Sequence, residues 1–217
     1  MTQTSQPLTI DVVSDVVCPW CYLGRGRLMA ALASRPDVES VVRWRPFQLD
    51  PTIPAGGLDR KDYMRRKFGS LDRLAPVHER LEALGSDLGI RFAFDAIQRS
   101  PNTLDAHRLI RLAAATGQQD ALVAKLFAAY FEQGKDIGDP AILRDVAAEA
   151  GLAAAEVESL LAGDALAEDV RREIDMAREL GIQGVPFFIF GGSHAVSGAE
   201  TPEVLASAID QARAAQA

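Results

Sequence analysis

The chain has 217 residues, of which 48% are hydrophobic and 24% charged, and its formal net charge is −7 at pH 7. This composition is typical of a globular protein with a sizeable core. The acidic balance argues against a general nucleic-acid binder, and no apolar run is long enough to cross a membrane. Residues 1–7 are polar and uncharged, unlike a secretory signal, so we expect a cytoplasmic protein whose thiols are mostly reduced.

The first predicted elements are a strand, a helix and a second strand. Residues 8–13 alternate in polarity, as a strand with one better buried face does. A helical pattern runs from Pro19 to a breaker cluster at residues 34–37, and residues 41–47 again have the character of a strand. A stretch rich in proline and glycine, residues 51–57, follows this second strand.

The only two cysteines, Cys18 and Cys21, stand between the first strand and the first helix. A Cys-x-x-Cys pair in this position is the arrangement of a thioredoxin-like redox site. Residues three apart at a helix start share a face, so the sulfurs can form a disulfide or separate into two thiols. Pro19 suits the first helical position, and Cys18 at the N-cap would meet free backbone N–H groups that favour a thiolate. We therefore expect Cys18 to attack a substrate and the less exposed Cys21 to resolve the intermediate.

Two other interpretations of the cysteine pair are weaker. A zinc site needs two more ligands, and the three histidines, His78, His107 and His194, do not have zinc-binding spacing. The alternative of two packed, unreactive thiols does not explain a proline and a tryptophan between them at a helix start. We therefore expect no metal site and no cofactor beyond the redox-active Cys18–Cys21 pair itself.

The middle of the chain is predicted to be helical. A helix period runs through residues 71–88 and stops at Gly89, and residues 90–94 form a short apolar run with the character of an extended segment. Asn102 is expected to cap the next helix, which Gly117 ends. Four more helices are expected at residues 118–133, 140–150, 153–162 and 164–180.

The end of the chain returns to strands. Residues 185–190 have the pattern of a buried strand, residues 191–193 that of a hairpin turn and residues 194–197 that of a partner strand, before a last helix from Pro202. Because neither end of the chain could bury its strands alone, we predict an α/β thioredoxin-like fold, a mixed sheet flanked by helices, with a large all-helical insertion. The thioredoxin-like domain would comprise residues 1–57 and 181–217, and the inserted helical domain residues 58–180.

Pro186 opens a strand that otherwise has the pattern of a central one, where proline is rarely found. A cis bond between Val185 and Pro186 is one explanation, because cis peptides are almost confined to proline. A trans proline at the start of an edge strand is the other. The cysteine pair upstream favours the cis interpretation.

The cysteine pair, the helical insertion and Gly184-Val185-Pro186 before a hairpin and a terminal helix resemble the DsbA-like branch of the thioredoxin superfamily. This resemblance covers nearly the whole chain. Three further segments are similar to the FrnE-type cytoplasmic subgroup of that branch: Ser14-Asp15-Val16-Val17, Ser100-Pro101-Asn102-Thr103 with His107, and Gly134-Lys135-Asp136-Ile137.

The resemblance implies an activity and the roles of several residues. Cys18 would be the surface nucleophile of a thiol-disulfide oxidoreductase, and Cys21 its resolving thiol. Pro186 would be cis and stacked beside the disulfide, and the backbone of Val185 would pair with an extended protein or peptide substrate that contains a disulfide. Trp20 replaces a histidine of periplasmic DsbA, so the strongly oxidising character of that enzyme is not assumed here.

Other residues have a functional and a structural interpretation. Trp20 either flanks a substrate groove or is a half-buried helix residue. His107 either faces a cleft between insertion and sheet, where it would exchange protons with a thiol, or is an ordinary interfacial histidine. Asp15 either relays protons to Cys21 or forms a turn. The predicted substrate-binding residues are Pro19, Trp20, Val185, Pro186, His107 and Asn102.

A basic stretch follows the Pro/Gly-rich loop. A solvated helix face explains it best, although it would also attract an anionic thiol or an acidic partner. The stretch comprises Arg60, Lys61, Arg65, Arg66, Lys67 and Arg73.

Three functions are compatible with these observations. The first is thiol-disulfide exchange on protein or small-molecule disulfides, with glutathione as an optional co-substrate and the reductase or isomerase direction favoured in a reducing cytoplasm. The second is a glutathione-dependent isomerase or transferase, because kappa-type glutathione transferases and 2-hydroxychromene-2-carboxylate isomerases look similar in layout. In those enzymes a serine near the position of Cys18 would activate glutathione, without a Cys-x-x-Cys pair. The third is a chaperone-like binding module that uses the groove beside Pro186 and has the dithiol as a redox switch. Neither the recycling partner nor the oligomeric state follows from the sequence.

Overall fold

A four-stranded sheet in the order β2-β1-β5-β6 is the centre of the computed structural model, which describes residues 6–216. Residues 1–5, part of the stretch compared above with a secretory signal, lie outside the described residues. Strand β1 runs parallel to β2 and antiparallel to β5, and β5 is antiparallel to β6. The sheet is therefore mixed, as predicted, and consists of β1 (Leu8–Ser14), β2 (Ser40–Pro46), β5 (Phe187–Phe190) and β6 (His194–Ser197).

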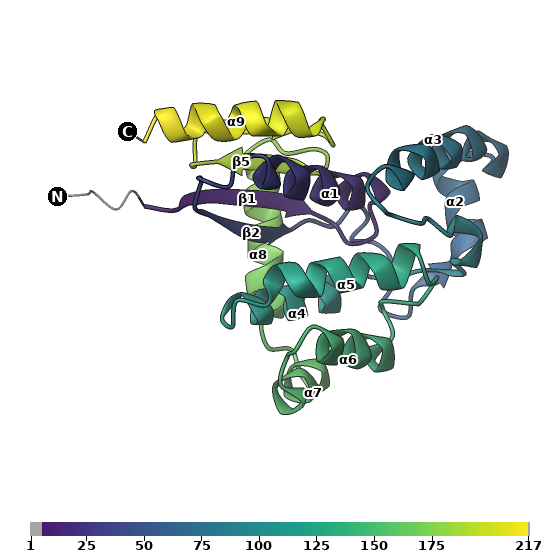
Figure 1. Cartoon of the computed structure of the whole chain (residues 1–217). Helices are drawn as coiled ribbons and strands as arrows, with labels where there is room; N and C mark the ends of the chain where they lie inside the picture. The colour runs from purple at the N-terminus through teal and green to yellow at the C-terminus, as the bar shows by residue number, and fades with distance from the viewer. Residues whose placement is uncertain (1–5, 217) are drawn as a thin grey trace.

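Helices cover both faces of the sheet. Helices α1 (Pro19–Ala33) and α9 (Pro202–Ala214) lie together along one side (Figure 1). Neighbouring residues of a strand point to opposite faces, and Val12 and Val13 of β1 accordingly belong to two separate hydrophobic clusters. Val13 packs with Ala177 of α8 (Ala167–Glu179), so α8 covers the opposite face.

The chain between β2 and β5 is mostly helical. In Figure 1, α2 and α3 lie near the end of β1 from which α1 begins, and α4 to α7 form a block beyond β2. The predicted thioredoxin-like sheet with a helical insertion is confirmed; the domain boundaries at residues 57/58 and 180/181 stay a prediction. The elements of this part are β3 (Leu58–Asp59), α2 (Arg60–Phe68), α3 (Ala75–Ser86), β4 (Arg99–Ser100), α4 (Leu104–Ala114), α5 (Gln119–Phe131), α6 (Pro140–Glu149), α7 (Ala154–Ala162) and α8, with 3₁₀ turns at Leu71–Arg73 and Phe94–Ala96.

The structure corrects one local prediction and adds a pair of short strands. The helix expected over residues 71–88 is divided into a 3₁₀ turn and α3, because Pro76 has no N–H to bond a preceding carbonyl and is favoured in a first helical turn. Residues 90–93 lie outside helices and strands, and the second 3₁₀ turn begins at Phe94. The two-residue strands β3 and β4 pair antiparallel, and they were not predicted because two residues carry no detectable period.

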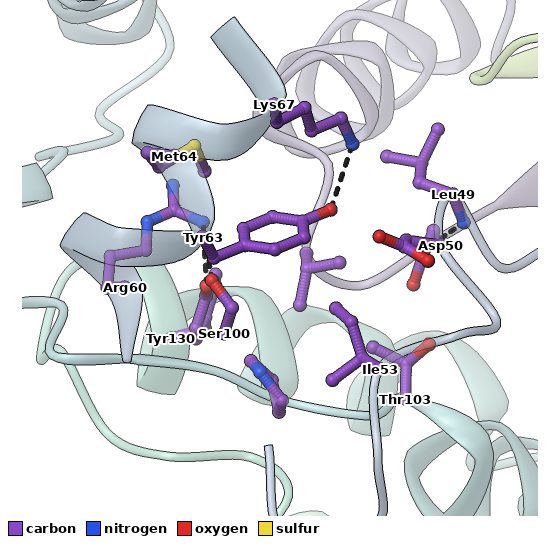
Figure 2. Close-up of a pocket in the computed structure, with 13 residues that line it drawn as sticks. Leu49, Asp50, Ile53, Arg60, Tyr63, Met64, Lys67, Ser100, Thr103 and Tyr130 are labelled. Atoms are coloured by element: carbon purple, nitrogen blue, oxygen red, sulfur yellow. Dashed lines mark hydrogen bonds between the residues drawn. The ribbon is translucent and has the colours of Figure 1, made fainter. Parts of the chain in front are cut away.

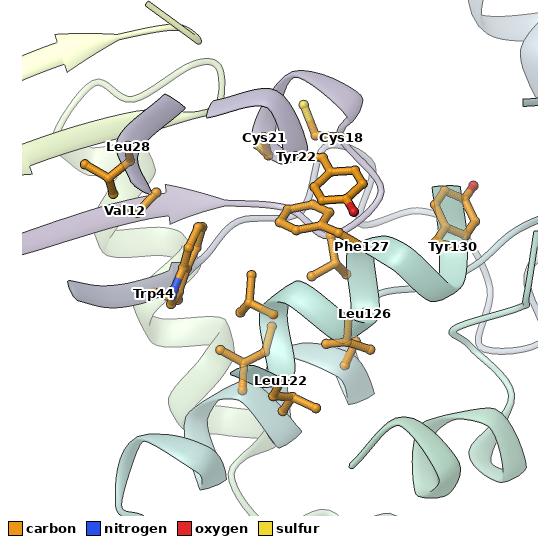
Figure 3. Close-up of a cluster of buried hydrophobic side chains, with 14 of the residues drawn as sticks. Val12, Cys18, Cys21, Tyr22, Leu28, Trp44, Leu122, Leu126, Phe127 and Tyr130 are labelled. Carbon is orange, nitrogen blue, oxygen red and sulfur yellow. The ribbon is translucent and has the colours of Figure 1, made fainter. Parts of the chain in front are cut away.

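Aromatic side chains join α5 to α1 and β2 (Figure 3). The Phe127 ring stacks on Tyr22 with a centroid distance of 5.0 Å and meets the edge of Trp44 at 6.4 Å. Phe127 is fully buried, and Tyr22 lies one residue after Cys21 on α1. The helix that begins at the cysteine pair is thereby fixed to the inserted helical block.

Candidate functional site

The two cysteines lie at the start of α1, in the positions predicted for them. Cys18 is the N-cap residue, with extended backbone angles, and Pro19 is the first helical residue. The carbonyl of Cys18 accepts a hydrogen bond from the N–H of Cys21 at 3.0 Å. The two cysteines approach within 3.5 Å, and both are free thiols. Their separation is therefore compatible with reversible closure to a disulfide.

Both thiols are buried, which corrects the expectation of a nucleophile at the surface. Cys18 is only 4% exposed and Cys21 is 0% exposed. The Cys18 thiol donates a hydrogen bond to the carbonyl of Val185, with an Sγ–O distance of 3.6 Å, so the segment before β5 covers it. Burial raises the pKa of the Cys21 thiol well above its ordinary range, and the hydrogen bond and charge of Cys18 raise it further. The Cys21 thiol is therefore a weaker acid than an ordinary cysteine and is fully enclosed.

Pro186 lies directly against the helix of the cysteine pair. Its peptide bond with Val185 is cis, and β5 lies between β1 and β6, so the edge-strand interpretation is wrong. A Cβ atom added at Gly24 of α1 would lie 2.8 Å from Cγ of Pro186 and 3.2 Å from Cζ of Phe188. Only glycine permits this approach. No local pattern predicts this contact, because it joins residues far apart in the chain.

We expect Gly24→Ala to destabilise the protein by about 1–3 kcal/mol through overpacking against Pro186, despite the better helix propensity of alanine. Urea unfolding followed by circular dichroism measures this change. Gly26→Ala is the matched control, because the added Cβ would first meet the flexible end of Leu88 at 3.0 Å. Equal unfolding midpoints for the two variants would show that the contact with Pro186 is not tight.

Trp20 is half-buried, in agreement with the second of its two interpretations. The guanidinium carbon of Arg80, on α3, lies 5.7 Å from the centroid of the Trp20 ring, within the range of a cation–π contact. Trp20 therefore links α1 to α3 beside the cysteines. Its contact with substrate stays a prediction.

His107 belongs to α4 and is buried against the loops that follow β1 and β2. Its Nε2 lies 2.9 Å from the carbonyl oxygen of Phe47 and 3.4 Å from Oδ1 of Asp15. Because a carbonyl only accepts, Nε2 carries the proton. Asp15 accepts the N–H of Leu49 at 2.8 Å through its other carboxylate oxygen, and its carbonyl accepts the N–H of Cys18 at 2.9 Å. His107 is thus an interfacial histidine, and Asp15 forms the turn that leads into the cysteine pair.

Asn102 does not occupy the N-cap of α4, which is Thr103. Its Oδ1 accepts the N–H of Leu104 at 2.9 Å, so it caps the helix from one position earlier. The same oxygen accepts from Gln48 at 3.1 Å, and Nδ2 donates to the carbonyl of Ile53 at 2.6 Å. Asn102 therefore ties α4 to the loop after β2, a link that local propensity could not predict.

A pocket opens beside the turn that leads into Cys18 (Figure 2). It has about 390 Å³ of empty space, part of which is open to solvent. Asp15 and Val17 contribute to its wall, and Arg60, Tyr63 and Lys67 of α2 line it from another side. The prediction of a solvated basic face on α2 missed this pocket, because the period of a helix does not tell which loops pack against it.

The described residues offer no alternative centre for metal chemistry. Within residues 6–216, no group of three histidine, cysteine or acidic side chains is arranged to hold a metal ion. His78 instead stacks on Phe94, with ring centroids 3.9 Å apart. No helix in the same part of the chain has the length and apolar character needed to span a bilayer.

A free dithiol at a helix start, next to a cis-proline on a mixed sheet with a helical insertion, places the molecule in the thioredoxin superfamily. The family described as DSBA-like thioredoxin domain matches residues 9–210. The chain therefore belongs to this family, as the resemblance implied. The uncharacterized protein YwbO of Bacillus subtilis (strain 168) is 30% identical to it over 201 residues, which cover 92% of this chain and 94% of YwbO.

Solved structures show the same fold. A probable DsbA oxidoreductase from Streptomyces coelicolor is 33% identical and superposes with a TM-score of 0.86, over 95% of this chain and 90% of that one. A 2-hydroxychromene-2-carboxylate isomerase is 20% identical, with a TM-score of 0.69 over 94% of this chain and 95% of the isomerase. At this lower identity the likeness concerns the fold alone.

Proposed function

We propose that the chain is a thiol-disulfide oxidoreductase in which Cys18 is the nucleophile and Cys21 the resolving thiol. The observation that carries the proposal is the pair of free thiols within 3.5 Å of each other at the start of α1. Cys18 caps the N-terminus of α1, where the positive end of the helix dipole favours a negative charge. Membership of the DsbA-like family supports the same chemistry.

The exchange proceeds in two steps. The Cys18 thiolate attacks one sulfur of the substrate disulfide, a mixed disulfide forms, and the other substrate sulfur leaves as a thiolate that takes up a proton. Cys21 then loses its proton and attacks Sγ of Cys18, which releases the second substrate thiol and leaves a Cys18–Cys21 disulfide. Two electrons pass from the dithiol to the substrate. A thiol reductant such as glutathione restores the dithiol.

An extended peptide that pairs with the backbone of Val185 is the proposed protein substrate. The Val185 carbonyl already contacts the Cys18 thiol at 3.6 Å, so a segment bound there would bring its disulfide to Cys18. Pro19 and Trp20 between the cysteines, and the adjacent Pro186, would flank it. His107 and Asn102 would act only indirectly, because both are engaged with the loop after β2.

Trapping of the mixed disulfide tests the proposal. We expect Cys21→Ser to accumulate a covalent adduct of one substrate half with Cys18, detected by intact-protein mass spectrometry. Cys18→Ser is the matched control and should form no adduct. Equal adduct formation in both variants, or none in either, would contradict the assigned roles.

The compartment decides the direction of electron flow. In a reducing cytoplasm, which we propose as the location, the pair would be held as a dithiol and would act as a reductase or isomerase. Redox titration against glutathione measures the potential: a value near about −270 mV supports a reductase, and one near about −120 mV an oxidant.

The double variant Cys18→Ser/Cys21→Ser separates the alternatives. If this variant loses disulfide exchange and shows neither glutathione-dependent isomerase activity nor client binding, the oxidoreductase is supported. Retained isomerase activity would favour the isomerase type, whose fold this chain shares. Retained binding of an unfolded client would favour a chaperone-like module.

A further inference from the structure

Helix α2 presents two cations to the pocket beside the cysteine turn. Arg60, Tyr63 and Lys67 are spaced at i, i+3 and i+7, so they share one helix face, and all three line the pocket. In Figure 2, Arg60 and Tyr63 lie to the left of the loop that carries Leu49 and Asp50. The other basic side chains of α2 do not line the pocket and are exposed: Lys61, Arg65 and Arg66.

These two cations contact hydroxyl groups and no carboxylate among the described residues. Arg60 Nη1 lies 3.4 Å from the Ser100 hydroxyl and 3.3 Å from the Tyr130 hydroxyl. Lys67 donates to the Tyr63 hydroxyl at 3.1 Å. Neither neutral partner balances the charge, and a guanidinium has five donors that match a carboxylate. Both side chains therefore have unused capacity for an anion.

Two acidic residues line the same pocket, Asp15 and Asp50, and the carboxylate of Asp50 is already satisfied by its own neighbours. It accepts the N–H of Thr52 at 3.0 Å and a hydrogen bond from the Tyr63 hydroxyl. Burial raises the pKa of Asp50, but hydrogen bonds from Thr52 and Tyr63 and the charge of Lys67 outweigh burial and hold this pKa below its usual range. Burial and the charge of Asp50 raise the pKa of Tyr63 to about 12, so its phenol keeps the proton that Asp50 accepts. Among the described residues, Arg60 bonds hydroxyl groups and forms no ion pair with either of these carboxylates.

The pocket borders the turn that leads into the nucleophile. Val17 contributes to its wall, and the carbonyl of Asp15, a second lining residue, is bonded to the N–H of Cys18 at 2.9 Å. The pocket is small and partly open to solvent, which suits the charged end of a small molecule rather than a folded partner.

We propose that this pocket makes the enzyme select small disulfides that carry a carboxylate. Arg60 and Lys67 bind the carboxylate while the substrate sulfur meets Cys18. The inference rests on the proposed exchange reaction and follows the same two steps, with the Cys18–Cys21 dithiol as the two-electron donor and an external thiol as the reductant that restores it.

Three small disulfides of similar size and different charge test the proposal: dithiodipropionate, which is anionic, hydroxyethyl disulfide, which is neutral, and cystamine, which is cationic. The readout is the ratio of kcat/KM for the anionic to that for the neutral disulfide, so that general effects on the cysteines cancel. We expect Arg60→Gln to lower this ratio about tenfold, as loss of a charge-assisted hydrogen bond does, and Lys67→Gln to lower it several-fold. The ratio of cystamine to hydroxyethyl disulfide should stay constant or rise.

Arg66→Gln is the matched control, because it makes the same charge change on the outer face of α2. It should leave the ratio unchanged. An equal fall of the ratio in Arg66→Gln would mean that the general charge of α2 causes the effect, and it would overturn the inference. An unchanged ratio in Arg60→Gln and Lys67→Gln would also overturn it. In both cases, exchange on hydroxyethyl disulfide would leave the proposed function intact. A wild-type protein inactive on all three disulfides would overturn the inference, and inactivity on a peptide disulfide as well would overturn the proposed function.

Discussion

The rate at which Cys21 resolves the mixed disulfide should rise about tenfold for each pH unit between about pH 6 and 8. Only the thiolate attacks, and below the pKa of a thiol its thiolate fraction increases tenfold per unit. Burial is the first cause of the raised pKa of Cys21, and it persists when Cys18 is bound to substrate. The hydrogen bond and charge of Cys18, the next causes, are removed in the mixed disulfide. The slope should therefore continue to the upper end of this range.

Stopped-flow reaction with the chromogenic disulfide dithiobis(nitrobenzoate) separates the two steps, because each releases one coloured thiolate. The first phase reports attack by Cys18 and the second reports resolution by Cys21. Cys21→Ser should lack the second phase and keep the first. A second phase that does not change with pH would contradict the prediction, because it would mean that Cys21 is already ionised or that a step other than its attack limits the rate.

The cysteine site was predictable because its signals are local. Two cysteines three apart, with Pro19 between them after a strand, define an N-cap, a helix start and a shared face without knowledge of the rest of the fold. Pro186 was also informative, since a proline before a central strand demands a special explanation. These signals, together with the two strand-rich ends of the chain, were sufficient for the fold.

The surroundings of the site were not predictable, because they are made by contacts between distant segments. The burial of Cys18 depends on the segment around Val185, and the close packing of Pro186 depends on the missing side chain of Gly24. Asparagine is a residue type typical of an N-cap, but Asn102 also bonds to the loop after β2. Arginine is a residue type typical of the surface, but Arg60 lines a pocket. In each case the local pattern was compatible with several environments, and tertiary packing selected one.

Replacing Phe127 with alanine should lower the free energy of unfolding by about 3–5 kcal/mol. Phe127 is fully buried and contacts aromatic rings from two other elements, Tyr22 of α1 and Trp44 of β2. The surrounding rings are large and rigid, so they cannot collapse into the space that the phenyl group leaves. With a denaturant slope of about 2 kcal/mol per molar, the midpoint of urea unfolding should fall by about 2 M.

Phe68→Ala makes the same chemical change on a side chain that is 42% exposed at the end of α2, and it should cost no more than about 0.5 kcal/mol. The comparison also tests how the insertion supports the redox site. Phe127 holds α5 against the helix that begins at Cys18, so its loss should speed the alkylation of Cys21 by iodoacetamide under native conditions, whereas Phe68→Ala should not. A destabilised Phe127→Ala protein in which Cys21 stays as unreactive as in the wild type would mean that α1 is held by the sheet and α9 alone, and that the helical block contributes stability without shielding the dithiol.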